Sequence, residues 1–246
     1  MSGRGLKAMD SRTKILKLVA KAVRDWNLIE DGDRILIAAS GGKDSTSLAY
    51  ALSAARRMIG KSYELEALHI SSDFSSNCDK SVLADRMASW GIPLRDVFVP
   101  VVERLKPGRE MNCYWCSTQR RTELLKYACE KGFNKIALGH HMDDIVETFF
   151  MNMMDKGALR SMPVRLAYKK YPVSIIRPLA WLEEREIIEF ADAEGILKTS
   201  CTCSYGSNSA RKTMRARIKE FTGASGTAKR RIMQAMTSGE HSLLEE

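Results

Sequence analysis

Two groups of residues in this chain have the types and spacing that chemistry requires, and the first is a short run of small and polar residues. Ser40-Gly-Gly-Lys-Asp-Ser45 follows the apolar run RILIAA, and a helical pattern begins directly after it. Small residues at such a turn let backbone N–H groups approach an anion, and the N-terminus of the new helix adds partial positive charge. The segment therefore predicts a phosphate-binding loop. It is not a Walker loop, because Asp44 stands where that motif requires Ser or Thr, and it lacks the Rossmann spacing of glycines.

The second group consists of cysteines. Cys113 and Cys116 form a Cys-x-x-Cys, and Cys201 and Cys203 form a Cys-x-Cys far downstream. A Cys-x-x-Cys fits a zinc site, a redox pair or an iron–sulfur cluster, and the distal cysteines bring the candidate ligands to three or four. Structural zinc commonly uses two Cys-x-x-Cys knuckles, which the distal pair fits less well. Cys129 lies in a helical pattern and is interpreted as a small buried apolar residue.

An alternation of strand and helix patterns must position both groups. Strands are predicted over residues 34–39, 64–70, 94–102, 135–139 and 173–179, and helices over 44–60, 79–91, 118–132, 143–156 and 183–195. This order predicts an α/β fold with a parallel sheet and helices on both faces. The Cys-x-x-Cys then falls in the loop after the third strand. Because ligands collect at the carboxyl edge of such a sheet, we expect the cysteines and the phosphate loop to open toward one crevice.

The phosphate loop carries a family resemblance. Ser40-Gly-Gly-x-Asp-Ser45 resembles the PP-loop of the ATP pyrophosphatase superfamily. This implies the adenine nucleotide alpha hydrolase-like fold, and cleavage of ATP between the α- and β-phosphates with adenylation of an acceptor. Gly139-His-His-Met-Asp-Asp144, at the end of the fourth strand, resembles the Gly-His-x-x-Asp-Asp segment of the members that modify tRNA. The resemblance implies that the nucleotide is bound by Ser40, Gly41, Gly42, Lys43, Asp44, Ser45, Gly139 and His140.

The same resemblance implies the catalytic groups. It assigns catalytic roles to Asp44, Asp143 and Asp144, and Arg120 is expected to steady negative charge near the cysteines. Carboxylates at this edge can hold Mg²⁺ against the leaving pyrophosphate. Capping of the following helix is the alternative role, for Asp143 in particular. Arg177-Pro-Leu also resembles a shared segment, but on physical grounds it is only the end of a strand.

The cysteines extend the resemblance to the tRNA 2-thiolation branch of the superfamily. In that branch a Cys-x-x-Cys before Arg or Lys and one distant Cys hold a [4Fe–4S] cluster, which implies Cys113, Cys116 and Cys203 as ligands here, with Cys201 as the alternative third. The cytidine-directed members are the most similar, although they usually carry Cys-x-x-Cys at the distal site. The resemblance favours a cluster over zinc and places a redox pair third.

Together these motifs imply an ATP-dependent tRNA sulfurtransferase. Such an enzyme adenylates the C2 oxygen of a pyrimidine, here expected to be an anticodon-loop cytidine, and replaces it with sulfur delivered by the cluster. The implied partners are tRNA, a sulfur donor (sulfide or a cysteine desulfurase) and a second copy of the chain. Two alternatives stay open: a zinc-stabilised PP-loop RNA-modifying ligase, and a non-catalytic RNA-binding module.

The chain divides into three parts by pattern. Residues 1–30 have apolar positions at helical spacing between Lys and Arg, which predicts a basic helix packed on the core. Residues 31–198 form the expected ATP-binding domain with its Cys-x-x-Cys loop, and residues 199–246 contain the distal cysteines and a basic helical tail. The N-terminus lacks a secretory signal, and no apolar run approaches the roughly 18 residues of a membrane span. We therefore expect a cytoplasmic protein with no membrane partner.

The balance of charge fits a polyanionic partner. The chain has 39 Lys and Arg against 30 Asp and Glu, a formal charge of +9. Tyr114 and Trp115, between the two cysteines, are expected either to stack on an unstacked base or to pack around the cluster. The cations of the tail indicate either RNA phosphate contacts or a solvated helix face, and they are Arg211, Lys212, Arg215, Arg217, Lys219, Lys229, Arg230 and Arg231.

Overall fold

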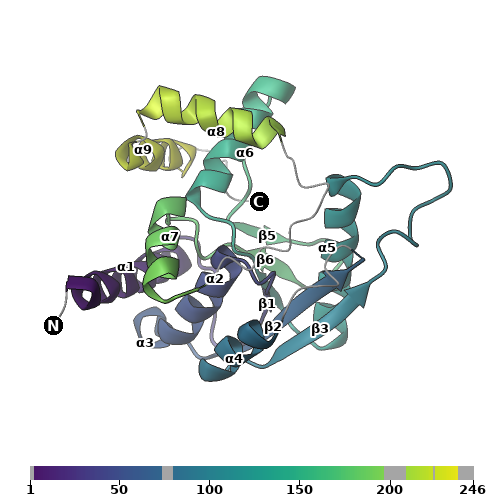
Figure 1. Ribbon diagram of the computed structural model, residues 1–246, viewed down its shortest axis with the longest axis horizontal. Helices are drawn as coiled ribbons and strands as arrows, with labels where there is room; N and C mark the ends of the chain where they lie inside the picture. The colour runs from purple at the N-terminus through teal and green to yellow at the C-terminus, as the bar shows by residue number, and fades with distance from the viewer. Residues whose placement is uncertain (1–2, 74–79, 197–208, 224, 238–246) are drawn as a thin grey trace.

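The computed structural model describes residues 3–73, 80–196, 209–223 and 225–237. These residues contain a six-stranded sheet in the order β3-β2-β1-β4-β6-β5 (Figure 1). The strands are β1 Asp33–Ala38, β2 Tyr63–Ser72, β3 Leu94–Val99, β4 Lys135–Ala137, β5 Arg165–Ala167 and β6 Ser174–Ile176. All neighbouring pairs except β5 with β6 are parallel, so the predicted α/β fold is confirmed.

The prediction of a wholly parallel sheet was wrong at one edge, where strand β5 is antiparallel. It follows α6, pairs antiparallel with β6 and forms one edge of the sheet. The hairpin between the two strands closes through a hydrogen bond from Tyr168 N to the Val173 carbonyl oxygen at 3.1 Å. Because β5 has only three residues, it offers too few positions for an alternating pattern to show. An antiparallel edge strand on an otherwise parallel sheet is common in this fold class.

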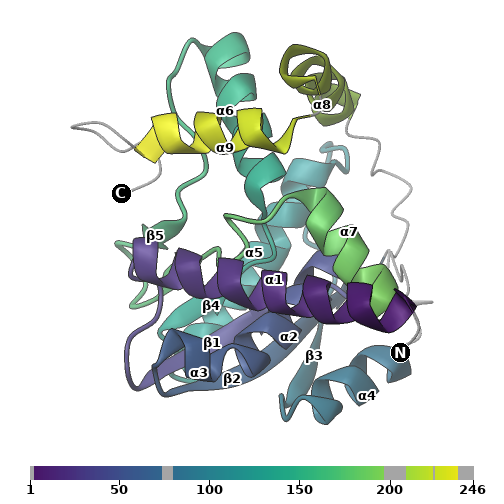
Figure 2. The ribbon, with the colours of Figure 1, turned by 90° about the vertical axis from the view of Figure 1, so that its left-hand side faces the viewer.

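Helices cover both faces of the sheet (Figures 1 and 2). Alternation of side chains along β1 sets up two cores. Ile35 and Ile37 pack with Leu48 and Phe190 on one face, whereas Leu36 packs with Leu125 on the other. The first face is covered by α1 Gly3–Asp25, α2 Lys43–Ala54, α3 Arg56–Ile59, α4 Ser81–Ser89 and α7 Glu184–Ala193, and the second by α5 Cys113–Glu130.

The predicted N-terminal helix is α1, and it packs along the outside of α2 and α7 (Figure 2). Its apolar stripe is buried, with Val19 and Ala22 fully covered, and the Trp26 ring stacks on Trp181 at a centroid distance of 5.0 Å. The basic side chains lie between these apolar positions. No helix in the described ranges is long and apolar enough to cross a membrane. The division of the chain into three parts stays a prediction.

The carboxyl edge of the sheet has a switch point between β1 and β4. Strands β2 and β3 lie in succession on one side of β1. Strand β4 lies on the other side of β1, and β6 lies beyond β4. Ligands in open α/β sheets bind at such a point. Helix α6, Met142–Lys156, begins there, and the basic tail forms α8, Ser209–Thr222, and α9, Gly226–Thr237, which pack on α6 (Figures 1 and 2).

Candidate active site

The predicted phosphate loop is a tight turn between β1 and α2. Gly41 has a φ of 81°, a left-handed conformation that favours glycine, and Gly42 is the N-cap residue of α2. Ser45 Oγ donates to the Gly42 carbonyl oxygen at 3.1 Å and lies 3.0 Å from Ser40 Oγ. The first N–H groups of a helix have no acceptor within it and point out of its N-terminus, which here is the carboxyl edge of the sheet. The loop therefore offers backbone N–H donors to a phosphate at the positive end of α2, with the two serine hydroxyls beside them.

The end of β4 lies directly against this loop. A Cβ added to Gly139 would be 3.0 Å from Ser45 N and 3.1 Å from the carbonyl carbon of Asp44. The missing side chain at Gly139 is thus what lets the two segments touch. In this way the structure brings the Gly-His-His-Met-Asp-Asp segment onto the phosphate loop.

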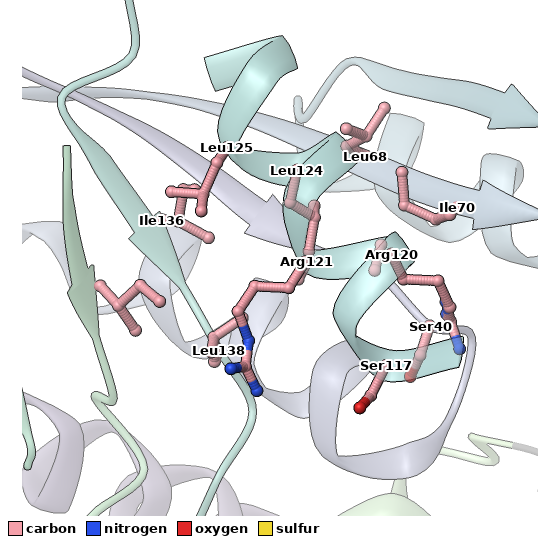
Figure 3. A pocket seen from close by; sticks show the side chains of 13 residues that line it. Ser40, Leu68, Ile70, Ser117, Arg120, Arg121, Leu124, Leu125, Ile136 and Leu138 are labelled. Carbon is pink, nitrogen blue, oxygen red and sulfur yellow. The ribbon is translucent and has the colours of Figure 1, made fainter. Parts of the chain in front are cut away.

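A cavity of about 190 Å³ opens beside the loop, between the sheet and α5 (Figure 3). Its lining is mostly apolar, and its polar side chains come from the loop and from the first turns of α5. An apolar slot with a few polar groups beside a phosphate loop suits a purine ring whose phosphates reach the loop. Arg120, one turn after Cys116, lines this cavity together with Ser40, Ser117, Arg121, Leu68, Ile70 and Leu124.

His140 is held by an arginine at the end of β6. Arg177 Nε donates to His140 Nδ1 at 3.3 Å, and the same guanidinium donates to the Pro163 carbonyl oxygen. Burial, followed by the charge of Arg177, lowers the pKa of His140 to about 4. The ring is therefore neutral near pH 7, and because Nδ1 accepts, its proton is on Nε2. His140 is thus a neutral hydrogen-bond donor that directly follows Gly139, the residue in contact with the loop.

Asp144 performs the capping role that the sequence suggested for Asp143. Asp144 Oδ2 accepts from the His141 backbone N–H at 3.1 Å, in the first turn of α6. Asp144 Oδ1 lies 3.2 Å from Arg211 of α8. The reason is position: Asp144 is the third residue of the helix, from which a side chain reaches back to the backbone of the N-cap.

Asp143 is engaged by α7 and α9 instead. Asp143 Oδ2 accepts from Glu184 N at 2.7 Å, and Asp143 Oδ1 pairs with Lys229. Although burial opposes the charge, the hydrogen bonds from Lys229 and from the Glu184 backbone lower the pKa of Asp143. Within the described ranges, no group of three or more His, Cys, Asp or Glu side chains could hold a metal ion. The role of the two aspartates toward Mg²⁺ stays a prediction, because Mg²⁺ often takes only one or two carboxylates and completes its shell with phosphate oxygens and water.

Ion pairs connect the phosphate loop with α8. Lys43 Nζ lies 3.1 Å from Glu184 Oε1, and Arg215 lies 2.9 Å from Glu184 Oε2 and 2.6 Å from Glu147 Oε1. Burial opposes the charge on Lys43, but the neighbouring Asp44 and Glu184 raise the pKa of this lysine. Glu147 is 2% exposed, and its burial raises its pKa against the opposing effect of Arg215. Part of the basic tail thus neutralises buried acids at the carboxyl edge.

The Cys-x-x-Cys lies on a helix, whereas the sequence placed it in a loop. Helix α5 begins at Cys113 because Asn112 caps it, accepting from a backbone N–H of the first turn at 2.9 Å. Cys113 is exposed and Cys116, one turn later, is half-buried. The N-terminal turn of a helix favours anionic ligands, so the two thiols fit two of the three expected thiolate ligands. Cys203, the predicted third ligand, and its alternative Cys201 lie outside the described residues.

Sequence reasoning missed Glu147 and Glu184 and gave little weight to Arg177. A local signal for Glu147 existed, because it stands four residues after Asp143 and so shares a helix face with it. Arg211 and Arg215 have the same spacing on α8. Two acids and two cations at matching intervals indicate helices that pair, but not which helices pair.

Over most of its length the chain is similar to a known protein family and to curated proteins. The model of the PP-loop domain family matches residues 8–222. The tRNA-cytidine(32) 2-sulfurtransferase of Geobacter metallireducens is 36% identical over 92% of this chain and 89% of its own length. That of Syntrophotalea carbinolica is 38% identical over 77% of this chain and 74% of its own. The chain therefore belongs to the tRNA-cytidine(32) 2-sulfurtransferase family of PP-loop proteins.

A solved structure supports the fold. The U34-tRNA thiolase NcsA from Methanococcus maripaludis, determined with its [4Fe–4S] cluster, superposes with a TM-score of 0.74 at 20% identity, over 93% of this chain and 78% of that one. The fold predicted from the PP-loop resemblance is thus confirmed. The family match confirms the resemblance to the cytidine-directed thiolation enzymes, and it does not favour the zinc-stabilised RNA-modifying ligase or the non-catalytic RNA-binding module.

Proposed function

We propose that this protein is an ATP-dependent tRNA sulfurtransferase that replaces the C2 oxygen of a pyrimidine, a cytidine of the anticodon loop, with sulfur. The observation that carries the proposal is the position of α5. This one helix holds Cys113 and Cys116 in its first turn and lines the cavity beside the phosphate loop with its next turns. A site for a sulfur-carrying group and a site for ATP thus lie on neighbouring turns of one rigid element.

The residues of the phosphate loop bind and orient ATP. Backbone N–H groups of the loop and the hydroxyls of Ser40 and Ser45 contact the phosphates, and the purine occupies the apolar cavity. The C2 oxygen of the base attacks the α-phosphorus, and pyrophosphate leaves. Arg120 and the neutral His140 stand beside the loop, where they stabilise the negative charge that develops. Sulfur at the oxidation level of sulfide then forms a bond to C2, and the C2–O bond breaks so that AMP leaves with the original oxygen.

Cys113, Cys116 and Cys203 hold the [4Fe–4S] cluster in this proposal. When bound, the cluster supplies sulfur to the adenylated base. The half-burial of Cys116 and the capped first turn of α5 support the assignment of Cys113 and Cys116 as two of the ligands. Asn112 supports them indirectly, because its cap starts the helix at Cys113.

Several partners belong to the same proposal. Each turnover consumes one sulfur atom, so a donor such as sulfide or a cysteine desulfurase must renew it. A cytoplasmic location is part of the proposal, because the substrate is tRNA. A second copy of the chain is also proposed. Helix α1 buries its apolar stripe in the core of its own chain, so this stripe does not supply the dimer surface. Mg²⁺ with ATP stays a prediction.

Asp44→Ala tests the role of the loop. The variant should lose ATP-dependent thiolation of tRNA in vitro while the anaerobically purified protein keeps its visible absorbance, because the cluster is held by other residues. Lys131→Ala, an exposed change at the end of α5, is the control. Near-normal thiolation by Asp44→Ala would remove the loop from the mechanism.

A cysteine series tests the cluster. Cys113→Ser, Cys116→Ser and Cys203→Ser should each abolish the visible absorbance. Cys201→Ser should keep it, and Cys129→Ser is the matched control because Cys129 lies on α5 far from its first turn. Bleaching by Cys201→Ser without bleaching by Cys203→Ser would reassign the third ligand, and a colourless wild-type protein that retains zinc would refute the cluster.

A further inference from the structure

The first turn of α5 exposes an aromatic ring. Tyr114 is 82% exposed, the largest fraction among the exposed large apolar side chains of the described residues. Its neighbour Trp115 is different, because the indole N–H donates to the Val101 carbonyl oxygen at 3.1 Å and the ring packs against the second core. The sequence offered stacking or packing for both rings. The structure separates them, since Trp115 packs and Tyr114 does not.

Helical spacing places Tyr114 on the same stripe of α5 as residues that line the cavity. Ser117 and Arg121 follow it by three and seven residues, which places all three on one stripe of the helix. Both of these residues line the cavity, and Figure 3 shows their side chains on α5. Side chains on a helix lean toward its N-terminus, and α5 begins at the carboxyl edge of the sheet. Tyr114 therefore extends this stripe toward the carboxyl edge, in the same first turn of α5 as Cys113.

The backbone that carries this ring is fixed by hydrogen bonds. The Tyr114 carbonyl oxygen accepts from Ser117 Oγ at 2.9 Å and from Thr118 Oγ1 at 2.8 Å. Asn112 caps the same turn. An exposed ring on a rigid turn loses only its own side-chain freedom when it contacts a ligand, which lowers the entropic cost of binding.

We propose that Tyr114 is the stacking platform for the base that is modified, an unstacked pyrimidine in a single-stranded loop of RNA. The inference rests on the proposed tRNA thiolation. A base must leave the stack of its loop before C2 can reach both the nucleotide and the sulfur, and an aromatic face replaces the stacking that the base gives up. Since every pyrimidine has such a face, Tyr114 holds the base without distinguishing cytidine from uridine.

The test compares three variants of the full-length protein with its cluster. Tyr114→Leu keeps apolar bulk and removes the aromatic face, whereas Tyr114→Phe keeps the face and removes the hydroxyl. Phe221→Leu is the matched control, because Phe221 is 79% exposed and lies on α8 against Phe150. The RNA is an anticodon stem-loop with the fluorescent base pyrrolocytidine at the position that the wild-type enzyme thiolates, as mapped by mass spectrometry.

Tyr114→Leu should weaken RNA binding about 5- to 150-fold, the range found when a base-stacking aromatic is replaced. It should also abolish the quenching of pyrrolocytidine that stacking causes, whereas Tyr114→Phe and Phe221→Leu should retain both affinity and quenching. Wild-type affinity and quenching in Tyr114→Leu would overturn the inference while thiolation by the wild type still supports the proposed function. An equal defect in Tyr114→Phe, or loss of visible absorbance in Tyr114→Leu, would also overturn it. Absence of thiolation by the wild type would overturn the proposed function itself, and the inference with it.

Discussion

The close approach of Gly139 to the phosphate loop leads to a prediction for Gly139→Ala. The added Cβ would lie 3.0 Å from Ser45 N and 3.2 Å from Ser45 Cα, whereas ordinary van der Waals contact begins at 3.4 Å. Both atoms belong to the backbone at the start of α2, so neither can rotate away as the end of a side chain could. The end of β4 and the start of α2 must therefore move apart by a few tenths of an ångström.

Two opposing effects set the size of the loss in stability. Overpacking a closely packed site costs about 1–3 kcal/mol. Replacing Gly by Ala also reduces the freedom of the unfolded chain, which returns about 0.4–1 kcal/mol. We expect Gly139→Ala to lower the free energy of unfolding by about 0.5–2 kcal/mol. Because a 1 Å misplacement of a binding group can cost about 100-fold in rate, the smaller shift of the loop should lower kcat/KM for ATP by about 10-fold.

Gly42→Ala is the matched control for stability alone, because Gly42 itself belongs to the phosphate loop. Gly42 has a φ of −77°, and a Cβ there would meet only Ser40 Oγ, at 3.5 Å. Its free energy of unfolding should stay unchanged or rise by up to about 1 kcal/mol. Urea denaturation measures stability, and tRNA thiolation at varied ATP concentration measures kcat/KM. If Gly139→Ala were as stable as the wild type and its kcat/KM for ATP lay within twofold, the close approach would not position the loop.

Three further predictions concern charged groups. The pKa of His140 is lowered to about 4 from an ordinary 6.5, so the unfolded chain gains the extra proton as the pH falls between these values. The contribution of the neutral His140 ring to the free energy of unfolding is present in full above pH 6.5. As the pH falls toward 4, this contribution is lost, by up to about 3 kcal/mol. In urea denaturation across this window, His140→Asn should show a flatter pH dependence than the wild type, and equal slopes would contradict the assignment. Arg215→Gln should lower the free energy of unfolding by about 1–3 kcal/mol, because it leaves the buried Glu147 without its main partner. The double variant with Glu147→Gln should recover part of that loss, and strict additivity would argue against the pair. Finally, Lys212→Gln with Arg217→Gln should reduce the slope of log affinity for tRNA against log salt by about 0.7–0.9 for each phosphate that the replaced cation neutralises, and an unchanged slope would return both residues to a solvated face.

The sequence predicted those parts of the site that directly follow a strand. The phosphate loop and the Gly139 segment each follow an apolar run, and parallel strands end at the same edge, so their meeting could be expected from topology. The start of α5 could not be predicted from topology. Cys113, Tyr114 and Trp115 have weak helix propensity, and the helical pattern becomes visible only after them. The cap by Asn112 decides the boundary, and a single Asn is a weak signal on its own.

The pairing of the basic tail with the acidic edge could not be predicted for a different reason. Arg215 and Glu147 stand 68 positions apart, and charge alone does not say whether a cation faces an acid, a phosphate or water. From composition and the expected substrate, Arg211 and Arg215 looked like phosphate-binding residues. In the structure both pair with acids of α6, and only tertiary packing supplies that information.

The formal charge of +9 therefore overstates what the tail can offer to RNA. A cation that already pairs with a buried acid can reach a phosphate only by leaving that acid uncompensated, which is costly when the acid is as buried as Glu147. Arg215 is better explained as a residue that holds α8 over the carboxyl edge. Lys212 and Arg217 lie on the same helix and are exposed, so they can bind phosphates without this cost. One helix thus carries two sets of cations, an inner set that pairs with acids beside the phosphate loop and an exposed outer set whose contact with RNA phosphates the salt experiment tests.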